Sequence, residues 1–267
     1  MGLRPWKEDM ISLICVSNDE KVLRTCLLAT LPSQDTQYEF INVDNRDGRF
    51  SSAAKALNHG GKNANGKYLM FVHQDITLLS DDVLREAERM MDSLPNAGVA
   101  GVAGKADDSG VMSNITHGDP PTPAGAKKIE RPEKVQTVDE CVVMVPRTVF
   151  DSLKFDEKTC DSWHLYAADY SLSALKRGLE VYVLPLNVHH YPAGRYPYTN
   201  SLTGMPEKYH KTLRRILRKH KKDFPRIHTS MGSWSTRWPL RLQLYAVRRR
   251  LRRARAKTER QLAETMR

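Results

Sequence analysis

Short apolar runs alternate with amphipathic stretches over the first 190 residues of the chain. The apolar runs predict strands at residues 10–17, 38–43, 67–72, 97–103, 135–145 and 180–188. The stretches with helical periodicity predict helices at residues 20–31, 51–60, 81–93 and 169–177, the second of them stopped by Gly60-Gly61. Because strands and helices alternate, we predict an α/β fold in which a Rossmann-like, mostly parallel sheet is flanked by helices.

Two segments depart from this alternation. Residues 105–134 hold several glycines and prolines among many charges, without sustained periodicity, so we expect a long surface loop there. The last 61 residues are strongly basic. We therefore divide the chain into a body, residues 1–206, and a basic C-terminal helical extension, residues 207–267.

The charge is distributed unevenly between these two parts. Of the 42 Lys and Arg residues, 20 lie in the extension, which holds only 4 of the 31 Asp and Glu residues. The body therefore carries 22 basic and 27 acidic residues, although the net charge of the whole chain is +11. Such asymmetry indicates an extension that meets a polyanion or an anionic membrane.

The extension contains two amphipathic stretches. Their apolar positions are Leu213, Ile216 and Leu217 in the first stretch, and Leu240, Leu244, Val247 and Leu251 in the second. We expect these positions either to enter an anionic membrane surface, with the arginines on the headgroups, or to pack on the body or on a second copy in a homodimer. Binding of nucleic acid is a third alternative, which we do not favour.

Composition narrows the class of protein. Hydrophobic residues make up 40% of the chain, which suffices for a buried core, and no apolar run approaches the roughly 20 residues that span a bilayer. Residues 1–10 show no signal-peptide stretch, and the four cysteines form no C-x-x-C pair. We expect a cytoplasmic protein, free or peripheral on the cytoplasmic face of the membrane. We also expect Cys15 and Cys141, each within an apolar run, to be small buried hydrophobes.

Polar side chains follow four of the predicted strands. These clusters are Asn18-Asp19, Asp44-Asn45, His73-Gln74-Asp75 and His189-His190. Because ligands bind beyond the carboxyl ends of strands in open parallel sheets, the clusters can converge on one crevice. Carboxylates in such a crevice suit Mg²⁺ or Mn²⁺, of which Mn²⁺ also tolerates imidazole. A carboxylate can also take the proton from an attacking hydroxyl.

The residues around these clusters resemble one enzyme family in an ordered set of motifs. In the first half the matching segments are Asp44-Asn45, residues 51–60 (SSAAKALNHG) and residues 64–75 (ANGKYLMFVHQD). In the second half they are residues 155–157, residues 163–172 (WHLYAADYSL) and residues 190–194 (HYPAG). Over residues 10–194 the chain resembles a family 2 glycosyltransferase with the GT-A fold, of the streptomycin-biosynthesis type.

The resemblance implies a role for each of several residues. Asp75 would hold a divalent cation, Mn²⁺ or Mg²⁺, against the diphosphate of the donor, with His190, or else His189, as a further ligand. Asp169 would be the general base, and Asp44 would contact the base or ribose of the nucleotide. The other residues placed at the nucleotide-sugar are Ser17, Asn18, Asn45, Lys55, Asn58, His73, Gln74, Asp139, Trp163 and His164.

Two positions depart from the family pattern. His73 stands where the first Asp of an Asp-x-Asp motif is commoner, and Ala168 precedes Asp169 where a Glu is common, so each site has one carboxylate fewer. Each remaining carboxylate also has a purely structural alternative. Asp75 can end a strand or cap a helix, Asp169 can cap the helix that follows it, and Asp44 can lie in a turn.

The resemblance implies an inverting transfer of a sugar from a UDP- or GDP-sugar to a hydroxyl of a glycan or lipid-linked acceptor. This interpretation requires Asp75 and Asp169 to share one cleft. Two other classes stay open: a silent body whose basic extension binds a membrane or nucleic acid, and a dinucleotide-dependent enzyme. The second of these lacks its G-x-G-x-x-G turn, since residues 17–20 read SNDE after the first strand.

Overall fold

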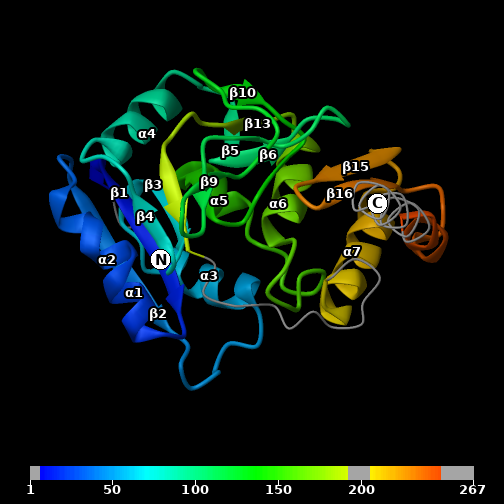
Figure 1. Cartoon of the computed structure of the whole chain (residues 1–267), viewed down its shortest axis with the longest axis horizontal. Coiled ribbons are helices and arrows are strands. Elements are labelled where there is room, and N and C mark those ends of the chain that lie inside the picture. Colours follow the sequence, from blue (N-terminus) through cyan, green and yellow to red (C-terminus); the bar gives the residue numbers. More distant parts are fainter. Residues whose placement is uncertain (1–6, 192–204, 248–267) are drawn as a thin grey trace, which may run out of the picture.

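The computed structural model describes residues 7–191 and 205–247, which form a central sheet with helices on both faces (Figure 1). The seven strands of this sheet stand in the order β10-β13-β5-β12-β3-β1-β2. Their bounds are β1 Lys7–Ser17, β2 Tyr38–Asp44, β3 Gly66–His73, β5 Ala97–Gly101, β10 Glu133–Lys134, β12 Val142–Pro146 and β13 Glu180–Val183. The predicted α/β fold with a mostly parallel sheet is confirmed.

Strand β12 runs against its neighbours in this sheet. β1 pairs in parallel with β2 and with β3, and β13 pairs in parallel with β5. β12 pairs antiparallel with β3 on one side and with β5 on the other, so that Val142 lies opposite Val72 near the carboxyl end of β3. The beginning of β12 therefore reaches the edge of the sheet where the parallel strands end.

Alternating side chains of the strands build a core on each face of the sheet. The helices that cover it are α1 Glu20–Thr25, α2 Leu27–Thr30, α3 Ala53–Lys62, α4 Val83–Asp92, α5 Arg147–Ser152 and α6 Tyr166–Leu175. In β3, Leu69 and Phe71 belong to the core that contains α3, α5 and α6, whereas Met70 and Val72 belong to the core of α1, α2 and α4. Because both faces of β3 are buried, its sequence is a continuous apolar run.

Helix α3 continues through Gly60 and Gly61, where the sequence predicted its end. A Cβ atom on Gly60 would lie 2.4 Å from Ile14 Cγ2, and one on Gly61 would lie 2.4 Å from Phe150 Cζ. The two glycines therefore allow α3 to pack closely on β1 and α5, and the helix ends only at Lys62.

The expected surface loop at residues 105–134 is wrong in part, because this segment contributes strands and core residues. This segment contains β7 Met112–Ser113, β8 Thr116–His117 and β9 Thr122–Pro123. These join strands before and after it, namely β4 Ile76–Leu78, β6 Ala103–Lys105, β11 Thr137–Val138 and β14 Val188–His190. They form two small sheets, in the orders β11-β6-β7 and β4-β14-β8-β9. Ile115 and Ile129 are buried in the two cores. Strands of two or three residues are too short to show a periodicity in the sequence.

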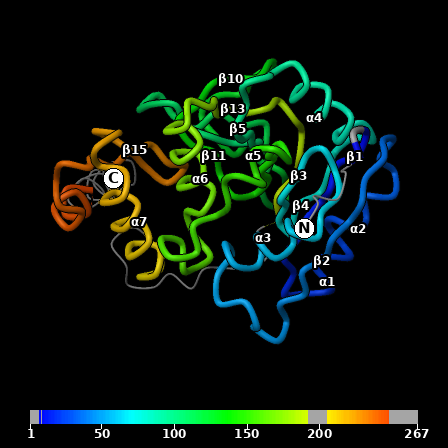
Figure 2. The backbone as a smooth tube through the Cα atoms, turned by 180° about the vertical axis from the view of Figure 1, so that it is seen from behind, coloured from blue at the N-terminus to red at the C-terminus, as the bar shows by residue number. Residues whose placement is uncertain are grey.

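The basic segment after residue 205 packs against the body. It forms α7 Glu207–His220, the antiparallel strands β15 Arg226–Thr229 and β16 Gly232–Ser235, and a helical stretch at residues 240–247. α7 lies beside α6, at the end of the molecule away from α1 and α2 (Figure 2). Leu213 and Ile216 are fully buried, in the same core as Phe155 of the body. The expected division at residue 206 therefore does not separate two cores.

The second amphipathic stretch also turns its apolar positions inward. Leu240 and Leu244 belong to the core shared with the body, and Val247 is partly exposed. Leu251 lies outside the described residues. Across residues 7–191 and 205–247, no helix combines the length and the hydropathy that crossing a bilayer requires.

If α7 belongs to the core of the body, truncating its buried face should destabilise the whole protein. We predict that Leu213→Ala lowers the free energy of unfolding by about 2 to 5 kcal/mol, as other buried leucine truncations do. Arg214→Ala removes the exposed neighbouring side chain and should change this free energy by less than about 0.5 kcal/mol. Urea unfolding followed by circular dichroism measures both. An unchanged midpoint for Leu213→Ala would show that α7 unfolds separately from the body.

Candidate active site

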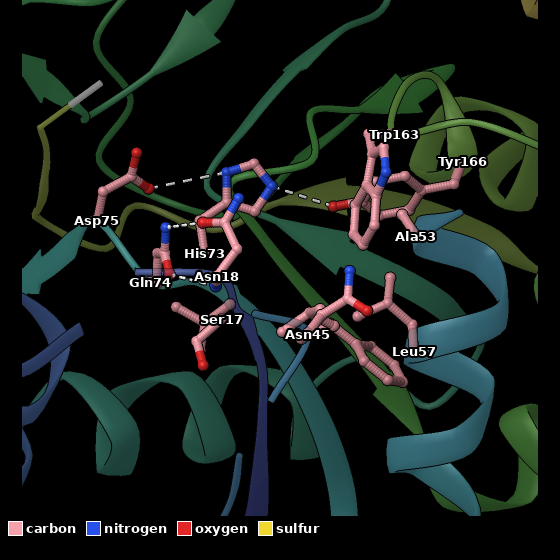
Figure 3. Close-up of a pocket in the computed structure, with 13 residues that line it drawn as sticks. Ser17, Asn18, Asn45, Ala53, Leu57, His73, Gln74, Asp75, Trp163 and Tyr166 are labelled. Atoms are coloured by element: carbon pink, nitrogen blue, oxygen red, sulfur yellow. Dashed lines mark hydrogen bonds and ion pairs between the residues drawn. The ribbon is translucent and has the colours of Figure 1, made fainter. Parts of the chain in front are cut away.

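The carboxyl ends of β1, β2 and β3 border a cavity of about 310 Å³, which we call the first cavity (Figure 3). The predicted site residues in its wall are Ser17, Asn18, Asn45, His73, Gln74, Asp75 and Trp163. Three of the four polar clusters that follow the strands thus converge, as the parallel arrangement of these strands requires.

Gln74 ties the ends of two strands together on one side of the first cavity. Its Oε1 accepts hydrogen bonds from the backbone N–H groups of Asn18 and Asp19, at 2.9 and 3.1 Å, and its Nε2 donates to Asn18 Oδ1 at 2.7 Å. Asn45 has a similar role at the end of β2, where its side-chain amide bonds both to the N–H and to the carbonyl of Phe50. These amides therefore shape the cavity, since their polar atoms are engaged within the protein.

Two aromatic residues lie across the first cavity from Gln74 and Asp75 (Figure 3). Trp163 is 41% exposed, so its indole ring is open to a planar ligand. Tyr166, which the sequence did not single out, is buried, and its hydroxyl lies 3.1 Å from His73 Nε2 and donates to the Glu140 carbonyl at 3.2 Å. The only available signal was its place in the motif around Trp163.

A second cavity, of about 450 Å³, adjoins the first, because His73 lines both. Its polar wall residues include His117, Asp139, Glu140, Cys141, His164, His190 and Tyr209. Asp139, Glu140 and Cys141 stand directly before β12, so the reversed direction of this strand brings them beside the end of β3. The predicted site residues Asp139 and His164 thus face the second cavity and not the first.

Three side chains that can bind metal meet at the junction of the cavities. One ligand atom from each of His73, Cys141 and His190 lies within 4.8 Å of the others. Asp75 Oδ1 lies 3.3 Å from His190 Nε2. His189 points elsewhere, since it is 2% exposed and its Nδ1 lies 2.8 Å from Thr116 Oγ1. Of the two alternatives, His190 is therefore the residue at the cluster. Cys141 is buried as expected, but beside polar groups that the sequence analysis did not connect with it.

Burial affects the acidic groups of the second cavity unequally. Burial, and then the charge of Asp139, raises the pKa of Glu140 to about 8. Burial also acts to raise the pKa of Asp139, but hydrogen bonds from Cys141 and the nearby His73 hold it below its ordinary value. Burial, and then Asp139, raises the pKa of the Cys141 thiol well above its usual range. The two neighbouring carboxyl groups thus differ in the pH at which they ionise, which suits separate acid and base roles.

Asp169 does not line a cavity together with Asp75, so the shared cleft that transfer with Asp169 as the base requires is not seen among the described residues. Asp169 is 1% exposed and lines neither cavity. Its Oδ1 lies 2.9 Å from His220 Nε2, and its Oδ2 accepts from Lys219 Nζ at 2.7 Å. Because α6 begins at Tyr166, Asp169 lies within the first helical turn and does not cap the helix. Both carboxylate oxygens are engaged by α7, which gives Asp169 a structural role.

Three more residues that we expected to contact the nucleotide form other interactions within the protein. Asp44 is partly exposed and forms an ion pair with Arg46 at 2.6 Å, which agrees with the turn alternative. Asn58 is buried and bonds to the backbone of Phe155 at 2.9 and 3.0 Å. Lys55 is exposed on α3, where its Nζ donates to Ser51 Oγ at 3.4 Å. None of these three residues lines the two cavities described above.

Comparison with known proteins identifies the family. The model of a family described as "Glycosyltransferase like family" matches residues 12–214, which is more than half of the chain. A protein of Fuscovulum blasticum described as "ATP synthase subunits region ORF 6" is 26% identical over 197 residues, covering 70% of this chain and 73% of that protein.

Several solved structures share the fold. S. aureus TarS 1–349 in complex with UDP matches with a TM-score of 0.53 and 16% identity, over 79% of this chain and 65% of that chain. The mannosyltransferase PcManGT from Pyrobaculum calidifontis, in complex with GDP-Man and Mn²⁺, matches with a TM-score of 0.54 and 12% identity, over 83% of this chain and 68% of that chain. GalNAc-T7 with UDP, GalNAc and Mn²⁺ matches with a TM-score of 0.53 and 11% identity, over 80% of this chain and 48% of that chain.

These comparisons confirm the enzyme family expected from the motifs. At such low identity the solved structures establish the GT-A fold alone, and this chain spans about two thirds of the TarS chain and about half of the GalNAc-T7 chain. The comparisons do not distinguish the streptomycin-biosynthesis type from other branches. The chain belongs to the glycosyltransferase-like family, of the family 2 type and with the GT-A fold.

Proposed function

We propose that this protein transfers a sugar from a nucleoside-diphosphate sugar, a UDP- or GDP-sugar, to a hydroxyl group of an acceptor, with inversion at the anomeric carbon. The observation that carries this proposal is the junction of the two cavities at His73. A transferase must hold donor and acceptor in contact while excluding water, and two adjoining cavities can do so.

The first cavity is the proposed donor site. It lies beyond the carboxyl ends of parallel strands, where open α/β sheets bind nucleotides. Trp163 offers an exposed ring on which a base can stack, and Asn18 and Asn45 also line this cavity, near the strand ends. TarS and PcManGT, which share the fold, are seen with UDP and with GDP-Man.

The second cavity is the proposed acceptor site, and Glu140 is its proposed base. Glu140 lines this cavity and its Oε1 accepts a hydrogen bond from the Leu165 N–H, whereas the neighbouring Asp139 accepts from both the thiol and the N–H of Cys141, at 3.0 and 3.2 Å. The acceptor oxygen attacks the anomeric carbon while its proton passes to the ionised form of Glu140, which becomes the major form above the raised pKa of about 8. The bond to the nucleoside diphosphate breaks, and the diphosphate leaves with the bonding electron pair.

A divalent cation at the cluster of His73, Cys141 and His190 is also part of the proposal. PcManGT and GalNAc-T7 are seen with Mn²⁺. The donors of this chain do not fit the expected Mg²⁺, because they comprise two imidazoles and a thiol, with Asp75 beside them. Mn²⁺ tolerates imidazole but has no preference for sulfur. The steps above therefore depend on the residues of this chain and not on the ion.

An exposed surface near the end of the described chain carries apolar side chains beside arginines. We propose that the enzyme approaches a lipid-linked glycan acceptor through this surface. Trp238 and Tyr245 are each 65% exposed, and Leu242 lies exposed on the same helical stretch. The exposed Arg237 and Arg241 stand among them. Of the two alternatives for Leu240 and Leu244, the structure agrees with packing on the body and not with entry of these leucines into the lipid. We propose that the exposed residues contact an anionic membrane at its cytoplasmic face, with the aromatic rings at headgroup level.

Nucleotide binding tests the donor site directly. We predict that UDP or GDP raises the unfolding temperature of the protein, since a ligand at 100 times its Kd stabilises by about 2.7 kcal/mol. Trp163→Ala should reduce this shift, whereas Leu79→Ala, which removes an exposed side chain outside both cavities, should preserve it. A thermal-shift screen across nucleotides and nucleotide-sugars measures both. If no nucleoside diphosphate produces a shift, the donor site is refuted.

The variants Glu140→Gln and Asp169→Asn separate the proposed base from the structural carboxylate. Glu140→Gln should lower kcat by about 10²- to 10⁴-fold, because it removes the proton acceptor, while the nucleotide-induced thermal shift persists. Asp169→Asn should instead lower the free energy of unfolding by about 3 kcal/mol, because it removes the charge that compensates Lys219. Asp161→Asn, which breaks the exposed pair with Arg215 of α7, should cost less than about 1 kcal/mol.

Rates of sugar transfer and urea unfolding curves, measured on the same preparations, distinguish these outcomes. Turnover at the full rate by Glu140→Gln excludes Glu140 as the base. Loss of turnover in Asp169→Asn protein that is fully folded under the assay conditions would return that role to Asp169.

Vesicle sedimentation tests the membrane contact. The double variant Trp238→Ala/Tyr245→Ala should bind anionic vesicles at least ~10-fold more weakly than the wild type, because it loses the apolar area that enters the interface. Leu79→Ala, at an equally accessible leucine 51% exposed, serves as the control. Equal binding by the double variant and the wild type would contradict a lipid contact at this surface.

A further inference from the structure

Three potential metal ligands meet where β3, β12 and β14 approach one another. His73 ends β3, Cys141 precedes β12 and His190 ends β14, and one ligand atom from each lies within 4.8 Å of the others. Main-chain pairing supports the arrangement. The His73 N–H donates to the Cys141 carbonyl at 3.0 Å, and His190 pairs with Ile76 of β4. Ligands carried by paired strands are held more precisely than ligands on loops.

The neighbours of these side chains are of the kind that orient metal ligands. His190 Nδ1 faces the Cys141 sulfur at 3.8 Å, while its Nε2 lies 3.3 Å from Asp75 Oδ1. The Tyr166 hydroxyl lies 3.1 Å from His73 Nε2. A histidine that ligates a metal through one nitrogen almost always donates its other N–H to a carboxylate, a carbonyl or water. His190 has this geometry, with Asp75 as the carboxylate.

The chemistry of the donors discriminates between metal ions. Mg²⁺ takes oxygen ligands, whereas a thiolate with two imidazoles suits Zn²⁺, which also binds more tightly than Mn²⁺ to a given set of donors. We propose that His73, Cys141 and His190 form a zinc-type site, selective for ions that accept thiolate sulfur over Mn²⁺ and Mg²⁺. Three protein ligands leave one position for water or a substrate oxygen, as in catalytic zinc sites.

The inference deepens the proposed function, because the cluster lies at the junction of the proposed donor and acceptor cavities. His73 borders both cavities, Asp75 borders the first, and Cys141 and His190 border the second. An ion held by these residues would place positive charge beside both proposed sites. The binding test needs no sugar donor, so it stands apart from the test of glycosyl transfer.

Cys141 loses a proton when the ion binds. In the free protein the thiol is protonated, because it is buried beside the carboxylate of Asp139. A divalent cation favours the thiolate form of Cys141 over the thiol form, because the positive charge of the ion stabilises the deprotonated sulfur. One sulfur–metal bond forms, one S–H bond breaks, and one proton passes to solvent for each ion bound. The carboxylates of Asp75 and Asp139 then lie close to the positive charge.

Co²⁺ is a spectroscopic probe for this site, because a cobalt–thiolate bond produces a charge-transfer absorption in the near ultraviolet. We predict that the full chain, freed of metal by EDTA, binds one Co²⁺ with this absorption. An equivalent of Zn²⁺ should abolish the absorption, and a roughly 100-fold excess of Mn²⁺ should not. Cys141→Ser should lose it, whereas Cys26→Ala, which removes a buried thiol outside both cavities, should retain it. Asp75→Asn should retain the absorption and bind Co²⁺ about 10- to 100-fold more weakly.

The wild-type chain by itself supplies the decisive signal. Absence of the absorption in the wild type overturns the inference, and so does its persistence in Cys141→Ser or its removal by an equivalent of Mn²⁺. Because the wild type is measured first, misfolding of a variant cannot conceal a negative result. Failure of every nucleoside diphosphate to shift the unfolding temperature would count against the proposed transfer and would leave the cobalt result unaffected.

Discussion

The antiparallel insertion of β12 between β3 and β5 is the constraint on which the site depends. Main-chain pairing from Val142 opposite Val72 to Pro146 opposite Tyr68 holds β12 in this direction. If β12 ran the other way, the residues before it would lie at the opposite edge of the sheet, about 17 Å away for five residues at ~3.3 Å each. The reversal therefore supplies the second cavity with Glu140 and the junction with Cys141.

Burial of Asp169 links the C-terminal segment to the same region. Removing a carboxylate from water costs several kcal/mol, and the cost is offset only when both oxygens have partners. Lys219 and His220 provide these partners, and both stand in the last turn of α7. Tyr209, in the first turn of α7, lines the second cavity. The ion pairs of Asp169 with the last turn of α7 therefore hold the whole helix in place, including Tyr209 in the wall of the proposed acceptor site.

The expected convergence of polar side chains is seen where it followed from strands that run in parallel. Asn18, Asn45 and Asp75 each follow a long apolar run, and parallel strands place such residues at one edge. Local sequence carries no information on a contact whose partner lies far away along the chain. Nothing near Asp169 indicates that it meets a lysine 50 residues later, and its position in a family motif suggested catalysis. Cys141 in an apolar run gave no sign of the two histidines beside it.

The sequence by itself determined the α/β class, the main strands and the family, because buried strands need continuous apolar runs and the motifs fall in a characteristic order. Only the tertiary structure decided the direction of β12, which of His189 and His190 lies beside His73 and Cys141, and the burial of the apolar positions in α7 and in residues 240–247. The physical reason is the range of the interactions concerned. The local sequence indicates which side chains are buried and the period at which apolar positions repeat. The direction of strand pairing and the long-range ion pairs depend on how all the elements pack together.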